Sequence, residues 1–191
     1  MAVVEYKGRK NQTELHQKLA LSPMGWAANK ATRKGMRFAT EFHVFHNYIV
    51  DAAILMTFQW RFAEAYGLIE RKPESPYVAY YEDAVCLFEA KQSIQDFKKD
   101  FSPSGFKGKN PKGTLNWVVT PKGLVSPGEV PGIWGLLEMR GNGLTEIKAP
   151  VSQKIETPEL QRIGYEMLWK GGRGSQYEDR FEVGRRIGEA R

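Results

Sequence analysis

The chain has 191 residues, of which 41% are hydrophobic and 26% are charged, and this composition suits a single globular domain with a sizeable core. The longest apolar run, residues 49–58, is interrupted by Asp51 and is much shorter than the ~20 residues that span a bilayer, so we expect no membrane partner. No apolar segment of signal-peptide length begins the chain, which predicts an intracellular, cytoplasmic protein. The single cysteine, Cys86, excludes an internal disulfide, and its apolar neighbours predict a buried thiol.

Positive charge is concentrated in two regions of the chain. The net charge is +6, and residues 1–38 and 91–123 are both strongly basic, whereas the tail from residue 154 is nearly neutral. Two basic regions beside a neutral remainder indicate a polyanionic partner. The alternative is that these lysines and arginines only keep the surface soluble.

The first half of the chain predicts a helix followed by strands. Asn11 caps a helix with Glu14 three residues later, and Ser22-Pro23 restarts it, because proline suits the first helical position. Residues 40–45 alternate between apolar and polar and predict a strand, His46-Asn47 predicts a tight turn, and residues 49–58 predict a central strand.

The second half alternates strands with short helices, which predicts an α/β fold with a mixed central sheet flanked by helices. We expect residues 1–155 to form this domain and residues 156–191 a C-terminal helical extension. The expected elements are a helix at 60–66, a loop at 67–80, a buried strand at 83–90, a helix at 93–100 capped by Ser93, a mobile basic loop at 102–112, a strand at 115–119, a hairpin from 133–139 and 144–148, and tail helices at 158–169 and 176–189.

The end of the buried strand at 83–90 carries the residues with the clearest chemistry. Glu89 and Lys91 are two apart, so on a strand their side chains leave the same face. If the strand that contains Asp51 is a neighbour, the two carboxylates converge, and with the carbonyl of Ala90 they form a hard-oxygen site for Mg²⁺ or Mn²⁺. Such an ion polarises a phosphate and activates water, and Lys91 orients or deprotonates that water and offsets charge on phosphorus. The alternative is a surface ion pair between Glu89 and Lys91, which contributes little.

A longer motif surrounds these residues. The stretch Glu89-Ala90-Lys91-Gln92-Ser93-Ile94-Gln95-Asp96-Phe97-Lys98-Lys99-Asp100 resembles the E-x-K-x-S-x-x-D-F-x-x-D signature of the MmcB-like branch of the PD-(D/E)XK nuclease superfamily. Residues 117–125 and 130–137, and upstream residues 13–16, 40–44 and 50–51, are similar to that branch in order. The resemblance covers residues 10–150 and implies a restriction-endonuclease-like core, a divalent metal and DNA, in repair or processing.

The resemblance also assigns roles to individual residues. Asp51, Glu89 and Lys91 fall on the catalytic triad, and Glu14 falls near a first-helix glutamate that often helps to hold metal. The 38 residues from Asp51 to Glu89 are many for neighbouring strands, so residues 60–82 look inserted. Asp83 is a rival for the triad aspartate, but six strand residues separate it from Glu89, or ~20 Å, which is too far to share a metal.

Several residues outside the triad are candidates for binding nucleic acid. His16 and His43 are interpreted as solvated surface residues rather than ligands, and Trp117 and Trp134 as core rather than base-stacking platforms. The lysines of residues 102–112 are interpreted as a phosphate clamp. The candidates are Gln92, Ser93, Lys107, Lys109, Lys112, Arg33, Lys34 and Arg37.

The predicted function is therefore that of a Mg²⁺-dependent DNA endonuclease. Two alternatives remain open: a nucleic-acid-binding module that keeps the nuclease fold without turnover, and an adaptor that acts through its C-terminal helices. The sequence leaves open whether the protein forms a homodimer.

Overall fold

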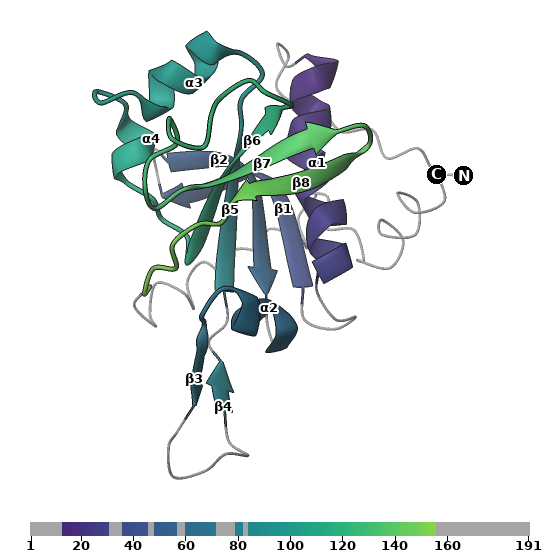
Figure 1. Cartoon of the computed structure of the whole chain (residues 1–191), viewed down its shortest axis with the longest axis vertical. Coiled ribbons are helices and arrows are strands. Elements are labelled where there is room, and N and C mark those ends of the chain that lie inside the picture. The colour runs from purple at the N-terminus through teal and green to yellow at the C-terminus, as the bar shows by residue number, and fades with distance from the viewer. Residues whose placement is uncertain are drawn as a thin grey trace.

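The fold is built on one mixed sheet of six strands, in the order β1-β2-β5-β6-β7-β8 (Figure 1). The computed structural model describes residues 13–30, 36–45, 48–56, 60–71, 79–81 and 84–155. The β5–β6 and β6–β7 pairs are parallel, and the other pairs are antiparallel. The strands are β1 (Met36–Phe45), β2 (Tyr48–Met56), β5 (Ala84–Ala90), β6 (Leu115–Pro121), β7 (Gly135–Arg140) and β8 (Gly143–Lys148).

Helices cover both faces of this sheet. Helix α1 (Glu14–Lys30) packs on the face that contains Phe88 and Trp117, and helix α3 (Ile94–Phe101) packs on the opposite face, against Val118. Because neighbouring residues of a strand point to opposite faces, Trp117 and Val118 divide between the two cores. The short helix α4 (Phe106–Lys109) follows α3 on that second side. The expectation of an α/β fold with a mixed sheet flanked by helices is confirmed.

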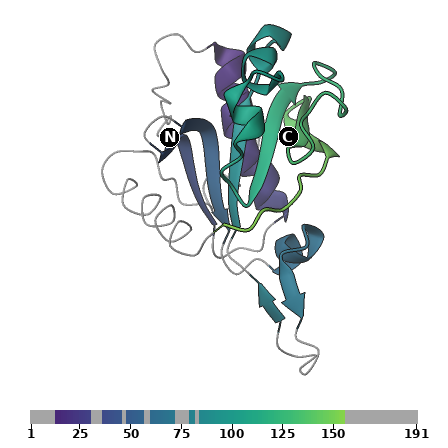
Figure 2. The same ribbon diagram turned by 90° about the vertical axis from the view of Figure 1, so that its left-hand side faces the viewer.

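The segment between β2 and β5 is the one that the spacing of Asp51 and Glu89 marks as inserted. It contains helix α2 (Trp60–Ala65) and a separate two-stranded sheet of β3 (Ile69–Arg71) and β4 (Ala79–Tyr81). The β3–β4 hairpin stands clear of the main sheet in both side views (Figures 1 and 2). The expected loop at 67–80 was therefore wrong at its ends, where backbone pairing between β3 and β4 forms short strands.

The strand pair β1–β2 is irregular at Asp51. Val50 and Ala53, three residues apart, pack in the same core cluster, whereas strict alternation would put them on opposite faces. On β1 the residue opposite Asp51 is Glu41, whose φ of 46° lies in the left-handed region that residues other than glycine rarely adopt. The alternation of side chains between the two faces of the sheet is therefore interrupted once in both strands, and Asp51 lies at this interruption.

The first helix is continuous, so the expected restart at Ser22-Pro23 was wrong. Pro23 is buried inside α1, and the hydroxyl of Ser22 donates a hydrogen bond to the carbonyl of Lys18 at 2.6 Å. Burial of the apolar face of α1 against the sheet outweighs the hydrogen bond that proline cannot make. The observed cap is Thr13, whose Oγ1 accepts from the His16 amide at 3.2 Å, while Asn11 lies outside the described residues.

Other predicted elements have mixed outcomes. The capped helix after Ser93 and the C-terminal hairpin are confirmed, and Trp117 and Trp134 are fully buried. The basic segment expected to be a loop contains α4 instead. The turn at His46-Asn47, Asp83 and both tail helices lie outside the described residues. No helix among the described residues is long and apolar enough to cross a membrane.

Candidate active site

Glu89 and Lys91 leave the end of β5 side by side. Glu89 is fully buried, the Lys91 side chain is 5% exposed, and the Lys91 Nζ lies 3.7 Å from Glu89 Oε2. Strand β5 is central in the sheet, and residues of α3 and α4 contact its end, which explains why the end is shielded from water. The pair is therefore a buried one, unlike the solvated surface pair that was the alternative.

Asp51 lies against the same segment. Its Oδ2 accepts a hydrogen bond from the Ala90 amide at 2.8 Å, and its Oδ1 lies 3.1 Å from His16 Nε2 on α1. The predicted neighbouring strands are confirmed, since β2 pairs antiparallel with β5 and Ala52 is opposite Phe88. Ala90 thus contributes its amide to the site, and the use of its carbonyl as a metal ligand stays a prediction.

His16 is a member of the site that the sequence interpretation missed. Its hydrogen bond to Asp51 raises the pKa of His16 despite partial burial. Burial tends to raise the pKa of Asp51, but the bonds from His16 and the Ala90 amide outweigh it, so that pKa is lowered. The sequence spacing could have indicated this position, because His16 is three and four residues before the buried Leu19 and Ala20 and so lies on the face of α1 that packs on the sheet.

Lys91 is surrounded by carboxylates and stays charged. Its Nζ lies 2.5 Å from Asp100 Oδ2 and 3.7 Å from Asp96 Oδ1, both on α3. Burial tends to lower the pKa of Lys91, but Glu89, Asp100 and Asp96 raise it, and the net pKa is above its ordinary value. Of the two roles predicted for Lys91, this environment favours orientation and charge compensation over deprotonation of water.

Lys107 points into the site instead of into solvent. Its Nζ donates to Glu89 Oε1 at 2.6 Å and to the carbonyl of Ile49 at 2.9 Å, and it lies 3.9 Å from Asp100 Oδ2. Burial is the main cause that raises the pKa of Glu89 to about 7, with Lys107 and Lys91 opposing it. Within the part of the chain that the structure describes, Glu89 Oε2 has no hydrogen-bond partner.

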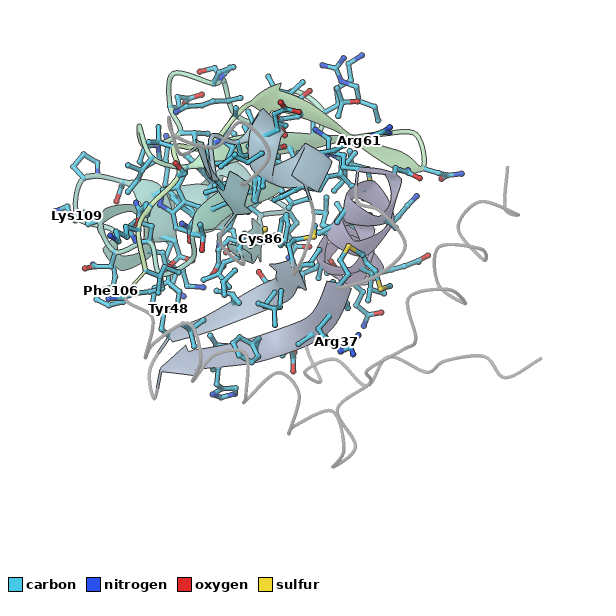
Figure 3. The ribbon with its side chains drawn as sticks, turned by 90° about the horizontal axis from the view of Figure 1, so that it is seen from below. Arg37, Tyr48, Arg61, Cys86, Phe106 and Lys109 are labelled. Atoms are coloured by element: carbon cyan, nitrogen blue, oxygen red, sulfur yellow. The ribbon has the colours of Figure 1, made fainter. Side chains whose placement is uncertain are left out.

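Tyr48 is a second residue that the sequence did not reveal. It is 3% exposed, its hydroxyl has no hydrogen-bond partner among the described residues, and its ring centroid lies 5.9 Å from Lys107 Nζ. Burial, followed by the charges of Glu89 and Asp100, raises its pKa. Beside it is Phe106, which is 61% exposed, and Figure 3 shows Tyr48, Phe106 and Lys109 at the same end of the molecule.

The remaining predicted site residues are dispersed. Glu14 is exposed on the first turn of α1, and no described contact joins it to Asp51 or Glu89. Arg37 is exposed on β1 and lies far from Lys109 in Figure 3, so the two do not form one patch. The other positions are as follows: Gln92 accepts a hydrogen bond from Thr13, Ser93 caps α3, Lys109 is exposed, Lys112 is half-buried, and Arg33 and Lys34 lie outside the described residues.

The donor set fits a hard divalent cation with few protein ligands. Among the described residues, no group of three or more histidine, cysteine, aspartate or glutamate side chains is arranged to hold a metal ion. Asp51 and Glu89 come from paired strands, however, and are near enough for the charge of Asp51 to raise the pKa of Glu89, whose buried Oε2 still lacks a partner among the described residues. Mg²⁺ commonly binds through one or two carboxylates and keeps several waters, so Asp51 and Glu89 fit it.

Comparisons with known proteins establish the fold alone. No family model matches this chain, and no curated protein matches it. Among solved structures, the chain is similar to SPO1766, a protein of unknown function from Silicibacter pomeroyi, at 16% identity and a TM-score of 0.54. The similarity covers 85% of this chain and 89% of that one, so the two proteins share an α/β fold across most of their lengths.

Proposed function

We propose that this protein is a Mg²⁺- or Mn²⁺-dependent nuclease that hydrolyses phosphodiester bonds in DNA, on a restriction-endonuclease-like core. The observation that carries the proposal is the fully buried Glu89 carboxylate. One of its oxygens has no hydrogen-bond partner among the described residues and lies 3.7 Å from the Lys91 ammonium. A buried carboxylate with an unmet oxygen costs stability, and such groups are more common in functional sites than elsewhere.

The three residues divide the work. Asp51 and Glu89 would hold the divalent cation, which polarises the scissile phosphate and activates water when bound. The bonds of Asp51 to His16 and to the Ala90 amide fix its orientation before substrate arrives. Lys91 stays protonated, and its positive charge would stabilise the transition state, in which negative charge develops on the phosphate oxygens.

Basic residues around the site support a nucleic-acid substrate. Lys109 is exposed on α4, the helix that also carries Lys107, and Phe106 exposes an aromatic ring at the start of the same helix. Lysines bind phosphate without reading sequence, and exposed aromatic rings stack on unpaired bases. The expected binding is therefore weakly sequence-specific and sensitive to salt.

The test is DNA cleavage by the wild-type protein and by Lys91→Ala, with Lys122→Ala as the control for loss of a lysine that has no described contact to Asp51 or Glu89. We expect the wild type and the control to cleave in Mg²⁺ or Mn²⁺ and to lose cleavage in a chelator. Lys91→Ala is expected to bind DNA and stay folded but not to cleave, because the loss falls on the transition state. Cleavage by Lys91→Ala at the wild-type rate, or cleavage that survives the chelator, contradicts the assignment.

One observation favours a second function, a DNA-binding module without turnover. Two ammonium groups, those of Lys91 and Lys107, already offset the carboxylates of Glu89 and Asp100. Carboxylates whose negative charge is already offset by lysines of the same protein need a bound metal less than carboxylates without such partners. DNA binding by a protein that neither binds Mn²⁺ nor cleaves in any metal would establish this second function.

A further inference from the structure

The Lys107 ammonium lies in a cage of oxygen atoms from separate parts of the fold. Its partners are Glu89 Oε1 at the end of β5 and the carbonyl of Ile49 on β2, with Asp100 Oδ2 of α3 further away at 3.9 Å. A carboxylate and a backbone carbonyl are the oxygen types that bind hard cations in proteins. A side-chain cation therefore takes contacts that a divalent ion would use.

A divalent cation and the Lys107 ammonium compete for Glu89. Both are positive, and both need the same buried carboxylate, which already has the Lys91 ammonium 3.7 Å from its other oxygen. A third positive charge next to a fully buried carboxylate that already has two ammonium groups beside it is strongly repelled. Loading of the cation therefore requires Lys107 to withdraw.

The backbone around Lys107 is packed, but its side chain has a way out. A Cβ atom added at Gly105 would lie 2.3 Å from the carbonyl oxygen of Asp100, and one at Gly108 would lie 3.3 Å from Phe101, so α4 is held closely against α3. The Lys107 side chain is 21% exposed, and its four-carbon stem is flexible. Withdrawal is thus a change of rotamer on a helix that stays in place.

We propose that Lys107 is a switch: in the free protein it is bonded to Glu89, one of the two carboxylates proposed to hold the cation, and a DNA phosphate draws it outward, which opens Glu89 to the divalent ion. The proposal rests on the proposed function for the identity of the anion. Turned outward, Lys107 joins Lys109 on α4 and adds a phosphate contact. DNA and divalent cation then promote each other's binding, because each favours the same outward position of Lys107.

The test measures Mn²⁺ binding by calorimetry, without any assay of cleavage. Lys107→Met keeps a long unbranched side chain but removes the charge, and we expect it to bind Mn²⁺ at least about tenfold more tightly than the wild type in the absence of DNA. Lys122→Met, which removes an exposed lysine with no described contact to Asp51 or Glu89, is expected to match the wild type. A short DNA duplex is expected to tighten Mn²⁺ binding by the wild type and to have little effect on Lys107→Met.

Mn²⁺ binding by Lys107→Met that is absent, weaker than that of the wild type or equal to it overturns the proposal. If that variant does not fold, NMR of the lysine ammonium groups of the unaltered protein decides. We expect the Lys107 signal to shift when Mg²⁺ and DNA are added together, and an unchanged signal overturns the proposal. Tighter Mn²⁺ binding by a protein that never cleaves DNA supports the switch and removes the proposed nuclease function. Cleavage by the wild type, together with Mn²⁺ binding by Lys107→Met that is no tighter than that of the wild type, supports the nuclease function and overturns the switch.

Discussion

Replacement of Glu89 by glutamine is expected to change how the stability of the protein depends on pH. Glu89 is fully buried, and its pKa is raised from its ordinary value of 4.5 to about 7. Glutamine has nearly the same shape and cannot ionise, so Glu89→Gln removes the cost of a buried charge while keeping the packing. The same change removes a predicted metal ligand, and Mn²⁺ binding is expected to be lost.

The sign follows from proton binding by the two states. Between pH 4.5 and pH 7 the folded protein keeps a proton on Glu89 that the unfolded chain has lost, so the stability of the wild type falls as pH rises through this window. The difference between the two pKa values corresponds to about 3 kcal/mol. Below pH 4.5 and above pH 7 the contribution of Glu89 is constant.

The assay is urea denaturation of the wild type and of Glu89→Gln between pH 4.5 and pH 8, with a chelator present. We expect the free energy of unfolding of the variant, relative to the wild type, to rise by about 3 kcal/mol across this range. The effects of Asp51 and His16 are common to both proteins and largely cancel in the difference. Parallel pH profiles for the two proteins refute the reasoning.

Glu138→Gln is the matched control, because Glu138 is also a buried carboxylate but its pKa is shifted in the opposite direction. Burial tends to raise the pKa of Glu138, but bonds from the Gly123 amide and the Arg140 guanidinium outweigh it, and the pKa is lowered. Its contribution to stability is present above its ordinary pKa and is lost only as pH falls through the lowered one. Above pH 5, therefore, the difference between Glu138→Gln and the wild type is expected to stay flat.

Three further predictions concern other parts of the structure. Ser93→Ala removes the hydroxyl that accepts from the Asp96 amide at 3.2 Å, and we expect it to lower the free energy of unfolding by about 1 kcal/mol, measured by urea denaturation. His16→Ala removes the largest favourable contact of the Asp51 carboxylate, so the pKa of Asp51 is expected to rise in a carbon NMR titration, and an unchanged value contradicts the pairing. Lys109→Gln is expected to weaken DNA binding and to reduce the slope of log affinity against log salt by about one, as for one lost phosphate contact. If the variant and the wild type have the same affinity at every salt concentration, Lys109 does not contact phosphate.

Patterns local in the sequence predicted the strands, the capped helix and the residue pair at the end of β5. Two-residue spacing on a strand places Glu89 and Lys91 on one face whatever surrounds them, and the structure has them 3.7 Å apart. The Ser93 cap was predictable for the same reason, because the hydroxyl and the amide that it bonds are three residues apart. The continuous helix through Pro23 was not, because packing of α1 on the sheet overrode a local preference.

The sequence by itself determined which residues could do chemistry, and the tertiary structure decided which of them meet. The contact of His16 with Asp51 joins residues 35 apart, and that of Lys107 with Glu89 joins residues 18 apart. The interruption in β1 and β2 that sets the place of Asp51 depends on the pairing of two strands, and no local pattern carries it. Lys107 and Lys109 are two residues apart in the same basic segment, yet the ammonium group of Lys107 contacts a buried carboxylate and the side chain of Lys109 is exposed to solvent. The difference arises because α4 packs against α3 with only one side toward the sheet, and that side is defined once the whole chain has folded.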